Sequence, residues 1–255
     1  MTEPDSPAPQ ILERGEGVRL AYHKTAGRGP GVVFLGGFAS DMSGTKALAL
    51  EAWARECGQA FLRVDYQGHG DSSGRFEDGT IGTWRDDALA ALDQLTEGPQ
   101  ILVGSSMGGW IMLLAALARP QRVAGLVGLA AAPDFTEELL WARLTEEQQR
   151  TIEREGVWHM PSEYGDPLPI TRRLIEEGRE HLLLQRRIEI ACPVRLIQGT
   201  ADDDVPWGWA LKLQDALASA DVETTLVKDA DHRLSEPRDL DRLTATLERL
   251  LRQVG

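Results

Sequence analysis

A serine bracketed by glycines between two apolar runs constrains this fold more than any other feature of the 255-residue sequence. The pentapeptide Gly104-Ser105-Ser106-Met107-Gly108 follows a strand-like stretch, residues 100–103, and precedes a helix-like stretch, residues 110–118. A strand that passes directly into a helix must turn sharply, and small residues leave room for the backbone to fold back on itself. The pattern predicts that Ser106 lies on this turn in a strained conformation with its hydroxyl exposed.

The rest of the chain alternates short apolar runs with amphipathic helical periods. Such alternation is typical of a mostly parallel sheet with helices on both faces, so the fold class is α/β. Helical faces are expected within residues 81–95 and 240–254. The expected strands are residues 32–35, 60–64, 101–103, 123–129, 194–197 and 224–227.

The alternation stops between residues 133 and 189, which contain helix signals but no convincing strand. Residues 145–148 read Thr-Glu-Glu-Gln, the form of a helix-starting capping box. We expect an α/β core over residues 13–132 and 190–255, an inserted helical cap over residues 133–189, and a flexible tail over residues 1–12. Ligands of such sheets bind beyond the carboxyl ends of the strands, so the cap is expected to roof the site and govern substrate choice.

Composition excludes several classes of function. Acidic residues outnumber basic ones, 40 to 27, and the basic residues form no stripe, so no nucleic acid partner is expected. The apolar runs are shorter than the roughly 20 residues of a membrane span. Two cysteines without a short spacing indicate a reduced compartment. The acidic, proline-rich start resembles neither a signal nor a transit peptide, and the expected location is the cytoplasm.

A serine hydroxyl becomes a nucleophile when a base takes its proton and a third group orients that base. In this architecture the expected order along the chain is serine, acid, histidine. One strand-like run ends in a glycine turn followed by Asp202, Asp203 and Asp204, and the next is followed by His232. Asp202 is favoured because it is the first acid after the turn, whereas Asp204 is left as the alternative.

The remaining histidines fit a base less well. His69 precedes the serine in the chain between glycines and is expected to shape the pocket wall, and His159 falls in the cap. Surface or core roles are expected for the other two, His23 and His181.

Stabilising the developing oxyanion requires two backbone N–H groups. Met107 supplies one at the start of the helix after Ser106, and Phe38 supplies the other on the loop after the first strand. No motif for a cofactor or a metal is present; the aspartates at 202–204 lack the spacing of a calcium loop.

These residues resemble the α/β-hydrolase superfamily and, within it, the family of the mitochondrial palmitoyl-protein thioesterase also described as mycophenolic acid acyl-glucuronide esterase. The resemblance covers most of the chain from about Gly31, and it implies the triad Ser106, Asp202 and His232 with the oxyanion donors Phe38 and Met107. Much of the cap departs from the family. The matching segments are residues 44–49, 100–106, 156–158, 160–162, 205–207 and 231–233.

The expected function is hydrolysis of carboxylic esters or thioesters, of acyl-thioester or acyl-glucuronide type, through an acyl-enzyme and without a cofactor. The substrate is a small molecule or an acylated protein. The same triad also supports perhydrolysis, carbon–carbon bond cleavage or acyl transfer, and a non-catalytic ligand-binding protein is the alternative from another class. No oligomeric state follows from the sequence. The residues expected to bind substrate are Trp110, Trp158, His159, Met160, Tyr164 and Trp207.

Overall fold

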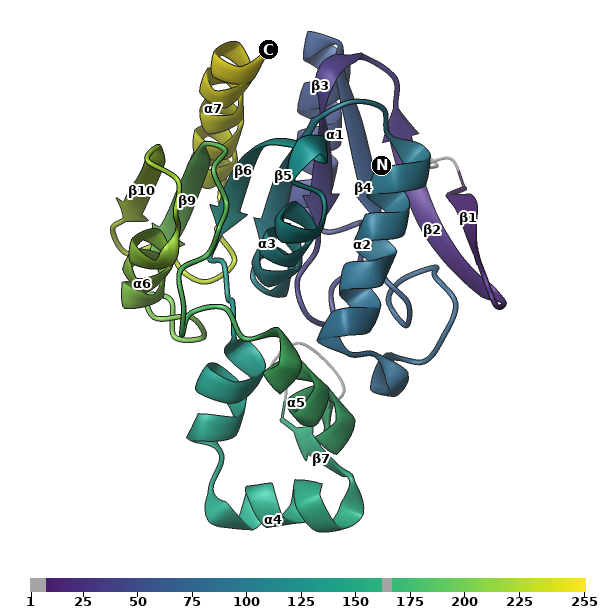
Figure 1. The fold of residues 1–255 in the computed structure, drawn as a ribbon, viewed down its shortest axis with the longest axis vertical. Coiled ribbons are helices and arrows are strands. Elements are labelled where there is room, and N and C mark those ends of the chain that lie inside the picture. Colours follow the sequence, from purple (N-terminus) through teal and green to yellow (C-terminus); the bar gives the residue numbers. More distant parts are fainter. Residues whose placement is uncertain (1–7, 162–166) are drawn as a thin grey trace, which may run out of the picture.

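An eight-stranded sheet forms the centre of the molecule (Figure 1). The computed structural model describes residues 8–161 and 167–255. The sheet has the order β1-β2-β4-β3-β5-β6-β9-β10, and every neighbouring pair from β4 to β10 is parallel. Its strands are β1 (Gln10–Gly15), β2 (Val18–Thr25), β3 (Arg28–Leu35), β4 (Gln59–Val64), β5 (Gln100–Ser105), β6 (Val123–Leu129), β9 (Val194–Gly199) and β10 (Val222–Val227).

The α/β class and all six expected strands are confirmed. The sequence prediction missed β1 and β2, which pair antiparallel with each other, while β2 also pairs antiparallel with β4. Both mix polar and apolar residues because β1 is the edge strand and β2 is its neighbour, at a part of the sheet where burial is incomplete. The tail expected over residues 1–12 is therefore wrong for residues 10–12, which belong to β1.

Helices cover both faces of the sheet, and the alternation of side chains along each strand divides the core. In β3, Val32 and Phe34 face α1 and α7, whereas Val33 and Leu35 face α2 and α3. Figure 1 shows α2 and α3 in front of the sheet. The helices are α1 (Thr45–Cys57), α2 (Ile81–Leu95), α3 (Met107–Ala118), α4 (Glu146–Glu155), α5 (Arg172–Gly178), α6 (Gly208–Ala216) and α7 (Pro237–Val254).

The segment between β6 and β9 forms the lower part of the molecule in Figure 1, beyond the ends of the parallel strands. The capping box expected at the start of α4 is present: the Thr145 side chain accepts from the backbone N–H of Gln148, and the Gln148 side chain accepts from the backbone N–H of Thr145. The short helical turns of the fold are η1 (Phe76–Asp78), η2 (Pro120–Arg122), η3 (Thr136–Leu140), η4 (Trp141–Arg143) and η5 (Arg179–His181).

This segment also contains two strands that the sequence prediction missed. β7 (Val157–Met160) pairs antiparallel with β8 (Leu168–Thr171). Each has four residues, too few to establish an alternating pattern. Ile152, Ile170 and Ile175 form a small separate core, which we call the cap cluster. No helix in the described part of the chain is long and apolar enough to cross a membrane.

Candidate active site

Ser106 lies on the turn from β5 into α3, as the pentapeptide predicts. Its φ of 54° and ψ of −119° are strained for a residue with a side chain. The flanking glycines make the turn possible: a Cβ on Gly104 would lie 2.3 Å from the carbonyl oxygen of Gly108, and one on Gly108 would lie 2.1 Å from that of Leu35. Any other residue at these two positions would collide with backbone.

Ser106, His232 and Asp202 lie in one chain of hydrogen bonds. Ser106 Oγ is 3.0 Å from His232 Nε2, and His232 Nδ1 is 2.9 Å from Asp202 Oδ2. Because an ionised carboxylate only accepts, Nδ1 carries the proton and Nε2 is left to accept the serine proton. Ser106 and His232 are 126 positions apart in the chain, and Asp202 and His232 are 30 positions apart. The parallel sheet brings the three residues together at the ends of its strands.

The surroundings of Asp202 fix its carboxylate in place. Its side chain is fully buried, and Oδ1 accepts from the backbone N–H groups of Asp204 and Val205, at 3.0 and 2.8 Å. Oδ2, which accepts from His232, also accepts from Gln198 Nε2 at 2.7 Å. These hydrogen bonds hold the buried carboxylate in one orientation, with Oδ2 turned toward His232.

Gln198 was missed by the sequence analysis. It is fully buried in β9, and its amide N–H₂ also donates to the carbonyl of Val205 at 3.0 Å. The signal was present, since Gln198 is a polar residue within the apolar run that leads to Asp202. Buried amides are retained where their hydrogen bonds matter.

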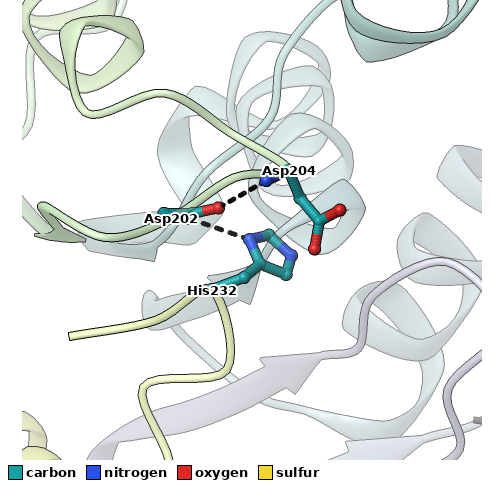
Figure 2. A group of neighbouring side chains, drawn as sticks. All are labelled: Asp202, Asp204 and His232. Atoms are coloured by element: carbon teal, nitrogen blue, oxygen red, sulfur yellow. Dashed lines mark hydrogen bonds and ion pairs between the residues drawn. The ribbon is translucent and has the colours of Figure 1, made fainter. Parts of the chain in front are cut away.

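The alternative acid, Asp204, occupies a different place. Figure 2 shows its backbone N–H bonded to Asp202 and its exposed side chain on the other side of His232. Possible ligand atoms of Asp202, Asp204 and His232 lie within 4.8 Å of one another. Both oxygens of Asp202 and both ring nitrogens of His232 take part in hydrogen bonds with other groups of the protein.

The loop expected to supply an oxyanion donor lies against the serine. A Cβ on Gly37 would lie 3.4 Å from Cβ of Ser106. The next residue, Phe38, packs its ring against those of Phe76, Trp84 and Phe135, with centroids 4.9 to 5.9 Å apart. Met107, the other expected donor, is the first residue of α3 and is fully buried. Met107 is thus buried directly after Ser106, and Phe38 is half-buried on the loop whose Gly37 lies against Ser106.

The residues expected to bind substrate are divided by the structure. Trp158 and Met160 are half-buried against the cap cluster, together with Phe38. Trp110 is fully buried, and its indole N–H donates to the carbonyl of His181 at 3.1 Å, so its prediction as a pocket residue is wrong. The helix that follows Ser106 is apolar on all sides, so its sequence does not distinguish residues that face the core from residues that face the cleft.

The other aromatic candidates lie elsewhere. His159 is exposed on the opposite face of β7 from Trp158 and Met160, as strand alternation requires. Trp207 is 47% exposed at the start of α6 and does not line the cleft at Ser106. Neither residue lies in the cleft beside Ser106, their roles in substrate binding stay predictions, and Tyr164 lies outside the described residues.

His69 and His181 have structural partners. His69 is buried with its ring against Tyr66, Phe76 and Trp84, and burial lowers its pKa. His181 bonds Glu177 at 2.8 Å. Neither of them contacts Ser106 within the described structure, so His232 is the histidine placed to act on this serine.

The fold and the site together define a hydrolase of the α/β-hydrolase class. The sequence pattern of the alpha/beta hydrolase family matches residues 32–245, and the chain belongs to this family. Among its relatives is the mitochondrial palmitoyl-protein thioesterase ABHD10. The Bos taurus protein is 44% identical over 94% of this chain and 79% of its own length, and the Homo sapiens protein is 43% identical over the same shares.

A solved structure, alpha/beta hydrolase domain-containing protein 10 from mouse, superposes with a TM-score of 0.90 at 41% identity, covering 97% of this chain and 100% of the other. These comparisons confirm the resemblance drawn from the motifs. They contradict the cytoplasmic location, because the relatives are named as mitochondrial. Cysteine content distinguishes reducing from oxidising compartments and says nothing about which reducing compartment holds the protein.

Proposed function

We propose that this hydrolase cleaves carboxylic thioesters and esters through an acyl-enzyme on Ser106. The observation that carries the proposal is the hydrogen-bond chain from Ser106 Oγ through His232 to buried Asp202, on a turn that exposes the serine. The names of the relatives support an acyl thioester as the substrate, from either a small molecule or an acylated protein.

In the proposed reaction Ser106 Oγ attacks the acyl carbonyl carbon while His232 Nε2 takes the hydroxyl proton. Asp202 holds the imidazole in the required tautomer and stabilises its positive charge. The negative charge on the carbonyl oxygen is stabilised by the backbone N–H groups of Phe38 and Met107. His232 then returns the proton to the departing sulfur or oxygen, leaving the acyl group on Ser106.

Water completes the cycle. His232 takes a proton from a water molecule that attacks the acyl-enzyme, and the carbon–Oγ bond breaks with that proton returning to Ser106. The products are a carboxylic acid and a thiol or alcohol, so atoms and charge balance without a cofactor.

Replacing the nucleophile tests this proposal. Ser106→Ala is expected to lower kcat on a hexanoyl thioester by about 10⁴-fold or more, because no acyl-enzyme forms. The matched control is Ser105→Ala, the buried neighbouring serine, which should retain most activity. A fluorophosphonate probe should label the wild type and the control but not Ser106→Ala. Equal losses in the two variants, or labelling without turnover of any acyl substrate, would contradict the proposal.

A further inference from the structure

A cleft of about 220 Å³ opens beside Ser106, and the balance of charged residues that line it differs from that of the whole chain. The net charge of the chain is −13. Among the residues that line the cleft, however, two are basic, Lys46 and Arg233, and one is acidic, Asp41. Lys46 lies in the first turn of α1, and Arg233 directly follows His232. An acidic protein therefore places two cations next to its nucleophile.

Lys46 is held in the cleft by uncharged partners. Its ammonium donates to the backbone carbonyl of Arg233 and approaches Ser235 Oγ at 3.4 Å. Burial, followed by the charge of Arg233, lowers the pKa of Lys46 to about 8, while Asp231 and Asp239 act in the opposite direction. An ammonium with a lowered pKa is one whose charge is poorly compensated, and an anion bound beside it would stabilise it.

The position of the cleft tells which half of the substrate it would hold. In the proposed reaction His232 protonates the departing atom, so the leaving group departs on the side of His232. Arg233 and Ser235 line the cleft on that side, close to His232 in the chain. The cations are therefore placed toward the alcohol or thiol half rather than the acyl half.

We propose that this cleft binds an anionic oxygen group, a carboxylate or a phosphate, carried on the leaving group of the substrate, with Lys46 and Arg233 as its ligands. The inference rests on the proposed acyl transfer and adds a leaving-group preference to it. Preferred substrates are acyl thioesters or esters whose thiol or alcohol half is negatively charged near the scissile bond.

Thioesters that differ only in the charge of the thiol test the proposal. Hexanoyl thioesters of 3-mercaptopropionate, of 3-mercaptopropionamide and of 2-mercaptoethyl phosphate provide a carboxylate, a neutral group of the same size and a phosphate. Released thiol is followed with a chromogenic disulfide, and each kcat/KM is divided by the rate of hydroxide hydrolysis of the same thioester. We expect the corrected kcat/KM to be about tenfold higher for an anionic thiol than for the amide. The larger of the two anionic values tells carboxylate from phosphate.

Substitutions of the two basic residues test whether the preference for anionic thiols arises in this cleft. Lys46→Met and Arg233→Gln should each reduce the anion-to-amide ratio, and the double variant should bring it within about twofold of one. The matched control is Lys24→Met: Lys24 is exposed in β2 near the starts of β3 and β5, at the other end of the sheet from Ser106, and its loss should leave the ratio unchanged. Arg233 is exposed, so its variant is not limited by folding.

The pH dependence provides a second readout. The anion-to-amide ratio of kcat/KM should fall as pH rises through about 8, since Lys46, whose pKa is lowered to about 8, loses its charge there. The acidic groups that face this site are Asp41, which lines the cleft, and Asp231 and Asp239, whose charges act on Lys46. Lys46→Arg keeps a charge that does not titrate and should hold the ratio constant.

The outcomes separate this inference from the proposed function. Hydrolysis that depends on Ser106 but shows equal corrected rates for charged and neutral thiols overturns the leaving-group preference alone. A preference that survives in the double variant also overturns it, because the site then lies elsewhere. Failure of the wild type to hydrolyse any of the thioesters overturns both proposals.

Discussion

At the scale of single residues, the proposed site includes buried side chains that lie behind Ser106 and His232. Asp202 contributes by being buried and fully hydrogen-bonded, with four donors around its two oxygens. Three consecutive aspartates left the choice among them open in the sequence, because the distinction lies in which carboxylate turns inward. The turn geometry that decides this is a property of the folded loop.

The first prediction at this scale compares two of these aspartates. Asp202→Asn is expected to lower kcat by about 10⁴-fold, because His232 loses its charged partner and adopts the wrong tautomer. Asp204→Asn keeps the backbone N–H that supports Asp202 and should stay within about tenfold of wild type. Steady-state kinetics of both purified variants on one thioester decides it. A larger loss in Asp204→Asn would move the orienting role to that residue.

The second prediction concerns Gln198, which we propose as a residue that positions the carboxylate of Asp202. Gln198→Met removes a hydrogen bond to a buried carboxylate, a contact of about 1.5–3 kcal/mol, so kcat should fall roughly 10- to 100-fold while KM changes little. Gln59→Met is the matched control: Gln59 is equally buried and bonds the carbonyls of Arg28 and Pro30, far from Ser106. If both variants lose stability but neither loses kcat, Gln198 is only structural.

At the scale of elements, the segment between β6 and β9 is the part that distinguishes this hydrolase from a bare sheet with its triad. Trp158 and Met160 from β7 and Phe38 from the core meet at the cap cluster. We propose that this apolar contact region selects the acyl chain without taking part in acyl transfer. The sheet formed by β7 and β8 was not predicted from the sequence, because both strands are short and β8 contains Pro169.

Chain length tests the role of the cap. Each buried methylene contributes about 0.8 kcal/mol, so kcat/KM of the wild type should rise with acyl length until the apolar site is full. Trp158→Ala should flatten this rise while leaving acetyl turnover within about tenfold. Trp207→Ala, an exposed tryptophan outside the cleft, is the control and should keep the wild-type profile. Equal losses on short and long chains would show that Trp158 is structural.

At the scale of the whole molecule, the sequence predicted most of the parallel part of the sheet because its inner strands are buried on both faces and form nearly continuous apolar runs; these are β3, β4, β5, β6 and β9. The edge strand β1 and its neighbour β2 carry mixed patterns and were missed. Of the candidate site, Ser106 and His232 followed from order and spacing, whereas Gln198 and the burial of Trp110 required the tertiary structure. Packing between distant segments decides such features, and local patterns do not record it.

A buried ion pair links two layers of the fold and gives the prediction at this scale. Arg63 of β4 donates to Glu51 of α1 through two nitrogens, at 2.8 and 3.0 Å, with both side chains almost inaccessible. Glu51→Ala leaves the guanidinium buried without its partner and should lower the free energy of unfolding by about 3–5 kcal/mol. Glu146→Ala breaks the exposed pair with Arg150 and should cost less than about 1 kcal/mol. Urea unfolding of both variants measures this, and equal losses would refute the assignment.

Phe38 connects the segment between β6 and β9 with the loop beside Ser106. Its ring belongs to both the main core and the cap cluster, while its backbone follows the residue that lies against Ser106. Phe38 also lines the cleft at Ser106, so we expect a substrate bound there to contact its ring and thereby steady the peptide group expected to face the oxyanion. The length of the acyl chain would thus affect both the affinity for the substrate and the rate of the chemical step.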